Sequence, residues 1–255
     1  MCVAAFAWQA HPRWRLVAIG NRDEYHARPA APLARWDDAD GVIAGRDLQS
    51  GGTWLGISEA GRFALVTNLR GYGDRASDKV SRGALVTDLL TGNGRYSDPA
   101  TATLADFNPF NLIFADGEQA SFLSNRPDPI CTALTHGLYG LSNGKLDEPW
   151  PKTLQLKAAL LDWLNGPAGD FAPLFSALAN EHLAEVGLPP REPSDVPREA
   201  PETPVFIHDE IYGTRCSTVV AVDKAGAGTI IERRFSQQGE PTGEAALTFH
   251  WPNPA

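Results

Sequence analysis

The chain begins with the sequence MCVAAFAWQAHPRWRLVAIGNRDEY, residues 1–25. Residues 3–8 and residues 16–20 are apolar runs, and His11-Pro12 separates them. Two apolar runs around a turn predict a β-hairpin. The second run ends in the polar residues 21–24, and the hairpin brings these residues back to Cys2. The stretch therefore predicts a thiol at the start of the chain, beside a guanidinium and carboxylates.

This arrangement favours nucleophilic chemistry at Cys2. Removal of Met1 leaves Cys2 with a free α-amine, whose pKa is about 7.7–8.0, beside a thiol of pKa about 8.5. The amine can act as the base for its own thiol, as in enzymes with an N-terminal threonine nucleophile. Arg22 near the sulfur favours the thiolate. Asp23 can accept a hydrogen bond from the protonated amine and orient it.

A simpler interpretation needs no chemistry. Cys2 is then a small apolar residue that opens a buried strand, and residues 22–24 form a solvated turn. Cys2 taken alone favours this interpretation, because a free cysteine is usually only buried. The polar cluster at the matching end of the hairpin makes the two interpretations equally well supported.

The composition of the 255-residue chain limits the classes of protein. A hydrophobic fraction of 43% with 21% charged residues is typical of a folded domain. The net charge of −9 argues against a general nucleic-acid binder and gives no attraction to anionic membranes. No apolar run approaches the roughly 20 residues of a membrane-spanning helix. With no recognisable signal peptide, a cytosolic location is expected. Three scattered cysteines predict neither a disulfide framework nor a zinc site.

The patterning predicts strands near both ends of the chain and helices in the middle, within a single domain of residues 1–255. The further predicted strands cover residues 42–44, 53–58, 62–68, 110–115, 119–123, 138–143, 213–222, 228–235 and 245–251. The predicted helices cover residues 81–90, 98–107, 152–164 and 171–183. The segments without predicted regular structure are residues 29–40, the glycine-rich residues 45–52 and a proline-rich surface loop at 187–204.

Three more polar residues lie at predicted strand ends. Asn68 and Asn143 each follow a strand, where an amide can donate to a developing oxyanion. A turn-capping role explains either amide equally simply. Arg215 opens a late strand, as a site electrophile or as a rim charge. The six histidines show no metal-binding spacing.

Four motifs together resemble one known family. They are NRDE at residues 21–24 followed by Arg28-Pro29, AGRD at 44–47, GGTWLG at 51–56 and TNLR at 67–70. These motifs resemble the NRDE family, also called the transport and Golgi organization protein 2 family, over almost the whole chain. The resemblance implies a link to lipid metabolism and haem trafficking, with an unsettled biochemical activity.

A more distant similarity concerns mechanism. The family is similar to the N-terminal-nucleophile hydrolases, in the branch of choloylglycine hydrolase and penicillin V acylase. This implies an α+β fold, a four-layer αββα sandwich with two antiparallel sheets between helical layers. The residues that match the branch's catalytic set are Cys2, Arg22, Asp23, Asn68, Asn143 and Arg215.

The spacing of Arg22 and Asp23 departs from the branch. There, two residues separate the arginine from the aspartate, whereas here the two are adjacent. Neighbouring side chains on a strand point to opposite faces. The spacing therefore argues against both side chains reaching the thiol, and Arg22 is the one expected to be set apart.

The resemblance implies a hydrolase of a linear amide or related acyl bond in a small or lipid-like substrate, with no required metal or organic cofactor. Cys2 attacks, its amine moves the proton, Asp23 orients the amine, the two asparagines stabilise the oxyanion, and Arg22 and Arg215 tune the thiolate. The rival is a non-enzymatic carrier of haem or another amphipathic ligand, with Cys2 or His26 as iron ligand. A third interpretation is an interaction protein with a vestigial site. The sequence selects neither the substrate nor the oligomeric state.

Overall fold

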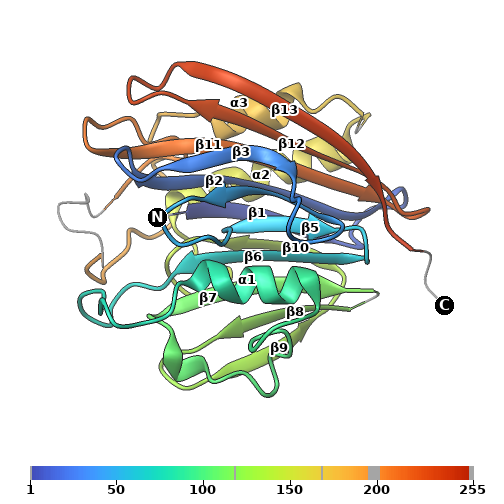
Figure 1. The fold of residues 1–255 in the computed structure, drawn as a ribbon. Helices are drawn as coiled ribbons and strands as arrows, with labels where there is room; N and C mark the ends of the chain where they lie inside the picture. Colours follow the sequence, from blue (N-terminus) through green and yellow to red (C-terminus); the bar gives the residue numbers. More distant parts are fainter. Residues whose placement is uncertain (1, 118, 168, 195–201, 253–255) are drawn as a thin grey trace.

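The computed structural model of the protein describes residues 2–117, 119–167, 169–194 and 202–252. Within these ranges, two antiparallel sheets pack face to face (Figure 1). The first sheet has the strand order β10 (Gly137–Leu141), β1 (Cys2–Trp8), β2 (Trp14–Tyr25), β11 (Tyr212–Asp223), β12 (Ala227–Phe235), β13 (Pro241–His250). The second has the order β3 (Ala30–Arg35), β4 (Val42–Asp47), β5 (Leu55–Ser58), β6 (Arg62–Asn68), β7 (Phe110–Asp116), β8 (Gln119–Ser124), β9 (Ile130–Leu134).

The alternation of side chains along β1 and β2 divides the interior into two cores. Residues such as Phe6 and Leu16 face the second sheet and join the core between the sheets. Their neighbours, such as Ala5 and Val17, face the other way and pack against helices. Because both faces of the hairpin are covered, its strands are apolar at nearly every position, which explains the two uninterrupted apolar runs.

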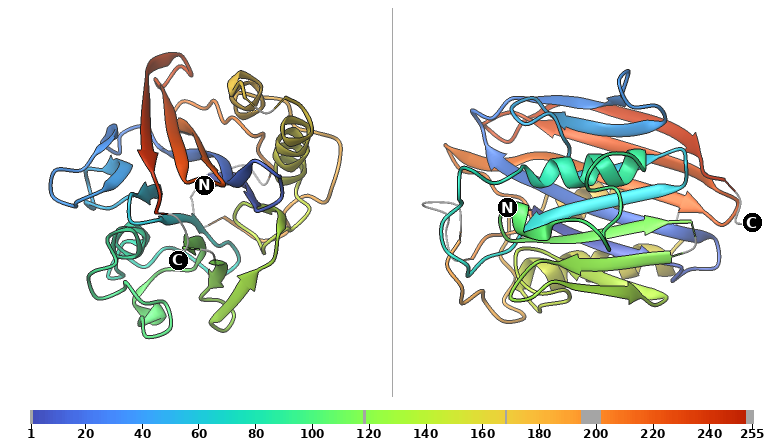
Figure 2. Two further views of the ribbon diagram at one scale, coloured as in Figure 1. Left: turned by 90° about the vertical axis from the view of Figure 1, so that its right-hand side faces the viewer. Right: turned by 60° about the horizontal axis from the view of Figure 1, so that its bottom comes forward.

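Helices cover the outer faces of both sheets. Helices α2 (Pro151–Asn165) and α3 (Ala172–Leu178) pack on the first sheet, and α1 (Arg82–Thr91) packs on the second. Figure 2 shows α1 and the α2–α3 pair on opposite sides of the molecule. The fold is therefore the α+β, four-layer αββα sandwich that the resemblance implied. Helix α1 ends where predicted, at Gly92, whose φ of 65° is left-handed.

The structure corrects three local predictions. Residues 30–35, predicted irregular, form the edge strand β3, where Pro32 is tolerated because an edge strand leaves one side unpaired. The helix predicted at 98–107 is only a single 3₁₀ turn, Leu104–Asp106. Helix α3 ends at Leu178, five residues before the predicted end at 183. Part of the predicted loop at 187–204, residues 195–201, lies outside the described residues.

Candidate active site

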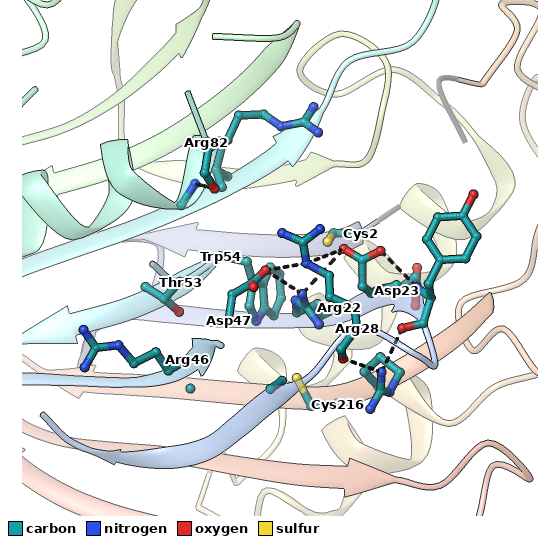
Figure 3. A pocket seen from close by; sticks show the side chains of 18 of the residues that line it. Cys2, Arg22, Asp23, Arg28, Arg46, Asp47, Thr53, Trp54, Arg82 and Cys216 are labelled. Atoms are coloured by element: carbon teal, nitrogen blue, oxygen red, sulfur yellow. Dashed lines mark hydrogen bonds and ion pairs between the residues drawn. The ribbon is translucent and has the colours of Figure 1, made fainter. Parts of the chain in front are cut away.

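A pocket of about 470 Å³ opens where strand ends of both sheets meet the start of α1. Its size is ordinary for a small-molecule site. Cys2 at the start of β1 and Arg22 near the end of β2 contribute from the first sheet. Asp47 and Asn68 contribute from the ends of β4 and β6 of the second sheet. Hence residues far apart in the sequence converge on one cavity (Figure 3).

Cys2 and Arg22 lie side by side across the hairpin. They are direct partners in the antiparallel β1–β2 register, so their side chains share the face toward the second sheet. The Cys2 side chain is buried, and this burial is the largest influence on its thiol and raises its pKa. The Arg22 charge and a hydrogen bond from the Asp23 backbone N–H act in the opposite direction and lower the pKa.

Asp23 takes the opposite face of β2, yet it also lines the pocket at the strand end. Its Oδ1 accepts a hydrogen bond from Thr214 Oγ1 at 2.7 Å, and its backbone carbonyl accepts one from the Tyr212 hydroxyl at 2.9 Å. These bonds hold a buried carboxylate in one place. Arg22 and Asp23 therefore both belong to the lining, which corrects the expectation that Arg22 would be set apart.

A β-bulge in β11 makes this arrangement possible. Thr214 pairs with Asp23, Cys216 pairs with Arg22, and Arg215 is the extra residue between them. The bulge places Thr214 and Cys216 on opposite faces, although residues two apart on a regular strand share a face. The bulge therefore lets β11 place Cys216 beside Arg22 on one face of the sheet and Thr214 beside Asp23 on the other.

Arg215 lines the pocket, and its hydrogen bonds hold the turn at residues 25–28. Its Nη1 donates to the backbone carbonyls of Tyr25, His26 and Arg28, at 2.9, 3.0 and 3.2 Å. Burial is the main cause that lowers its pKa, and the Arg22 charge lowers it further. The side chain thus fixes the segment that carries Arg28 into the pocket.

Asn68 and Asn143 have different positions. Asn68 lines the pocket, whereas Asn143 is fully buried and is not among the lining residues. The Asn143 Nδ2 donates to the Asn68 backbone carbonyl at 3.0 Å, and its Oδ1 accepts from the Ser142 hydroxyl at 3.2 Å. The same hydroxyl lies 3.1 Å from the Cys2 carbonyl. Asn143 therefore joins Asn68 to the Cys2 backbone from behind the pocket.

Four charged residues, Arg22, Glu24, Arg28 and Asp47, form an ion-pair cluster at the pocket wall, and of these the sequence assigned only Arg22 a role in the site. Asp47 Oδ2 lies 2.6 Å from Arg28 Nε and 3.3 Å from Arg22 Nη2. Glu24 Oε2 lies 3.5 Å from the same two nitrogens. The two-residue spacing of Arg22 and Glu24 on one strand was the available signal, because such residues share a face.

A second thiol and a buried carboxyl also line the pocket. Cys216 is hydrogen-bonded to Glu232, and burial raises the pKa of both groups. Glu232 Oε1 also accepts from the Leu33 backbone N–H at 2.9 Å, which ties β12 to β3 of the other sheet. A Cβ on Gly45 would lie 2.8 Å from Glu232 Oε2, so a side chain at this position would force the Glu232 carboxyl to shift. No sequence pattern marked this pair.

Within the described residues, no group of three or more His, Cys, Asp and Glu side chains is arranged to hold a metal ion. His26, the predicted iron ligand beside Cys2, is not among the lining residues, and its Nε2 lies 2.9 Å from the Asp209 carbonyl. None of the described helices has the length and apolarity to span a membrane.

Comparison with known proteins identifies the family. The model of the family described as Transport and Golgi organisation 2 matches residues 1–237. This chain belongs to the transport and Golgi organisation 2 family. It is 32% identical to the Homo sapiens protein named Transport and Golgi organization protein 2 homolog, over 91% of this chain and 92% of the relative. It is 28% identical to the Drosophila melanogaster Transport and Golgi organization protein 2, over 96% and 95%.

The fold is shared with a bile acid hydrolase of known structure. A mutant of conjugated bile acid hydrolase from Clostridium perfringens superposes with a TM-score of 0.57, over 97% of this chain and 92% of the hydrolase. The sequence identity is only 8%, so the likeness concerns the fold alone. The family match confirms the family that the sequence motifs indicated, and this superposition confirms the sandwich fold.

Proposed function

We propose that the chain, as one cytosolic domain of residues 1–255, is an N-terminal cysteine hydrolase of a linear amide or related acyl bond in a small or lipid-like substrate. The observation that carries this proposal is the position of Cys2. Its side chain opens β1 and lines the pocket with Arg22, Asp23 and Asn68. The burial of Cys2 alone suits an inert thiol, but an inert thiol needs no such polar surroundings.

The geometry supports the following sequence of steps once Met1 is removed. The α-amine of Cys2 takes the thiol proton, and the thiolate attacks the substrate carbonyl. The amine then returns the proton to the leaving group, and water hydrolyses the acyl-enzyme. Asp23, held by Thr214, orients the amine. A metal or organic cofactor has no role in these steps.

The asparagines divide the task of oxyanion stabilisation. Asn68 lines the pocket and donates to the oxyanion, a contribution worth about 2.7–4 kcal/mol in comparable sites. Asn143, with its Nδ2 bound to the Asn68 carbonyl, acts as a positioning residue and not as a second donor. This assignment replaces the equal roles expected from the sequence.

Intact-mass measurement with an acylating probe tests the proposal directly. Protein that starts at Cys2 is expected to take up one acyl group at Cys2. It should also hydrolyse a member of a library of N-acyl amides, esters and thioesters. Cys2→Ala should abolish turnover with the fold intact, and Cys2→Ser should be severely impaired because a hydroxyl is far less acidic.

The carrier hypothesis predicts a different result. A ligand held mainly by apolar burial loses only a small share of its binding free energy when one small side chain is removed. Wild-type protein that turns over no amide, ester or thioester, yet binds haem stoichiometrically with or without Cys2, would overturn the hydrolase proposal. Haem binding that requires Cys2 would identify the thiol as the iron ligand.

A further inference from the structure

The two ends of the Arg22 guanidinium differ in their partners. Its Nη2 contacts Asp47 Oδ2 at 3.3 Å, whereas its Nη1 is buried and has no hydrogen-bond partner among the described residues. A buried donor without an acceptor is costly, and native proteins keep such atoms mainly where they have a function. Arg22 is only 9% exposed, so solvent does not explain this atom.

The position of Arg22 indicates which acceptor completes the arrangement. Arg22 is the direct strand partner of Cys2 on one side and of Cys216 on the other. Both thiols are neutral when protonated, and a thiol sulfur is only a weak acceptor. When Cys2 loses its proton, the sulfur becomes an anion beside the guanidinium, and the free end of Arg22 gains a charged partner.

Asp47 contacts the other end of the Arg22 guanidinium and is itself held in place by hydrogen bonds. Its Oδ2 accepts hydrogen bonds from Arg22 and Arg28, while its Oδ1 accepts hydrogen bonds from the backbone N–H groups of Gln49 and Ser50 at 3.0 and 3.1 Å. The carboxylate is therefore fixed to the 47–52 turn of the second sheet, and it reaches across to β2 of the first (Figure 3). Glu24 also contacts Arg22 Nη2, but only as an ion pair at 3.5 Å.

We propose that Asp47 is a positioning residue for Cys2: it holds the Arg22 guanidinium against the thiol so that the arginine charge stabilises the thiolate. The inference rests on the proposed role of Cys2 as nucleophile, but it concerns thiol acidity and is measured without a substrate. Asp47 thus acts through Arg22 and does not contact the reacting atoms.

Coulomb's law gives the opposite expectation if Asp47 acts only as a charge. Removing a negative charge near a thiol favours the thiolate and speeds alkylation. Removing a positioning residue releases Arg22 and slows alkylation. The sign of the effect therefore separates the two roles.

The test measures alkylation of Cys2 by iodoacetamide from pH 6 to pH 10, followed by peptide mass spectrometry. Asp47→Asn keeps Oδ1 for the turn but places an N–H₂ donor against Arg22. The Cys2 rate at pH 7 is expected to fall about tenfold, the order of effect of one hydrogen bond to a charged group. Arg22→Gln should give a similar loss. Glu59→Gln is the control, because it removes a carboxylate that pairs with Arg35 and does not line the pocket, and its rate should not change.

The double variant Arg22→Gln/Asp47→Asn completes the test, because a residue that acts through Arg22 has no further effect once Arg22 is gone. The exposed Cys131 serves as an internal standard whose rate stays constant. If Asp47→Asn does not fold, Asp47→Ser replaces it, since serine still caps turn amides but is too short to reach Arg22. The inference would be overturned if Asp47→Asn left the Cys2 alkylation rate unchanged or raised it. It would also be overturned if Asp47→Asn lowered this rate by the same factor in the Arg22→Gln background as in the wild type. Failure of the protein to turn over any substrate would contradict the proposed hydrolase function but not this inference, because Cys2 alkylation is measured without hydrolysis.

Discussion

Asn143 donates a hydrogen bond from its side-chain nitrogen to the backbone carbonyl of Asn68, 3.0 Å away. The donor is fully buried, and the residue it supports lines the pocket. Two amides with the same position in the sequence pattern, each at the end of a strand, therefore have different surroundings. Of the two, only Asn68 lines the pocket.

The first prediction concerns these two asparagines. Asn68→Ala is expected to lower kcat by about 10²–10³, the cost of one oxyanion donor. Asn143→Ala leaves the Asn68 carbonyl without this partner and should lower the free energy of unfolding by about 1–3 kcal/mol. Steady-state kinetics and urea denaturation of both variants measure the two effects. Equal stability losses with equal kinetic losses would contradict the division of roles.

Asn21, the first residue of the NRDE motif, is predicted to be structural. It is fully buried on the face of β2 away from the second sheet, and its Nδ2 donates to the Leu178 and Val205 carbonyls at 2.8 Å each. Its Oδ1 accepts from the Ser217 hydroxyl at 2.7 Å. Asn21→Leu leaves three buried groups without these bonds and should cost more than about 3 kcal/mol of stability. Per folded molecule, the Cys2 alkylation rate should be unchanged, and a selective loss of Cys2 reactivity would refute the structural role.

Glu232 is predicted to make stability fall as pH rises. Burial raises its pKa above the usual 4.5, so the folded state holds its proton more tightly than the unfolded chain. The stabilisation is complete below pH 4.5 and is lost as the pH rises through the folded-state pKa. Glu232→Gln keeps an acceptor for Leu33 but does not titrate at this site. The stability of the wild type relative to this variant should decrease steadily above pH 4.5 in urea denaturation, and a flat difference would rule out the effect.

Processing of Met1 is predicted to control activity. A residue that precedes Cys2 converts its α-amine to an amide, which cannot accept a proton. Protein from cells should therefore start at Cys2 by intact-mass measurement. A matched pair tests the consequence: one preparation carries a cleavable N-terminal extension, and the other is cut to begin at Cys2. Only the cut protein should turn over substrate, and equal activity in both would exclude the amine as the base.

The sequence alone determined the hairpin of β1 and β2, and with it the neighbourhood of Cys2. Apolar runs around a turn predict an antiparallel pairing that returns residues 21–24 to Cys2, and the structure then sets Arg22 directly opposite Cys2. The motifs at residues 21–24, 44–47, 51–56 and 67–70 were enough for the family and thereby for the sandwich fold. Local patterns also predicted α1 and α2 closely, because each has apolar residues at helical spacing.

Only the tertiary structure decided which polar side chains face the pocket. A bulge at Arg215 changes the side-chain alternation of β11, and no sequence period reveals such a bulge. The hydrogen bonds that Asp47 accepts from Arg22 and Glu232 accepts from Leu33 cross between the two sheets, so they depend on how the sheets pack. Strand patterns specify which face a residue takes, whereas the contact across that face is set by long-range packing. For this reason the position of Cys2 beside the polar residues of β2 was predictable from the sequence, whereas the contacts of Asp47 and Glu232 were not.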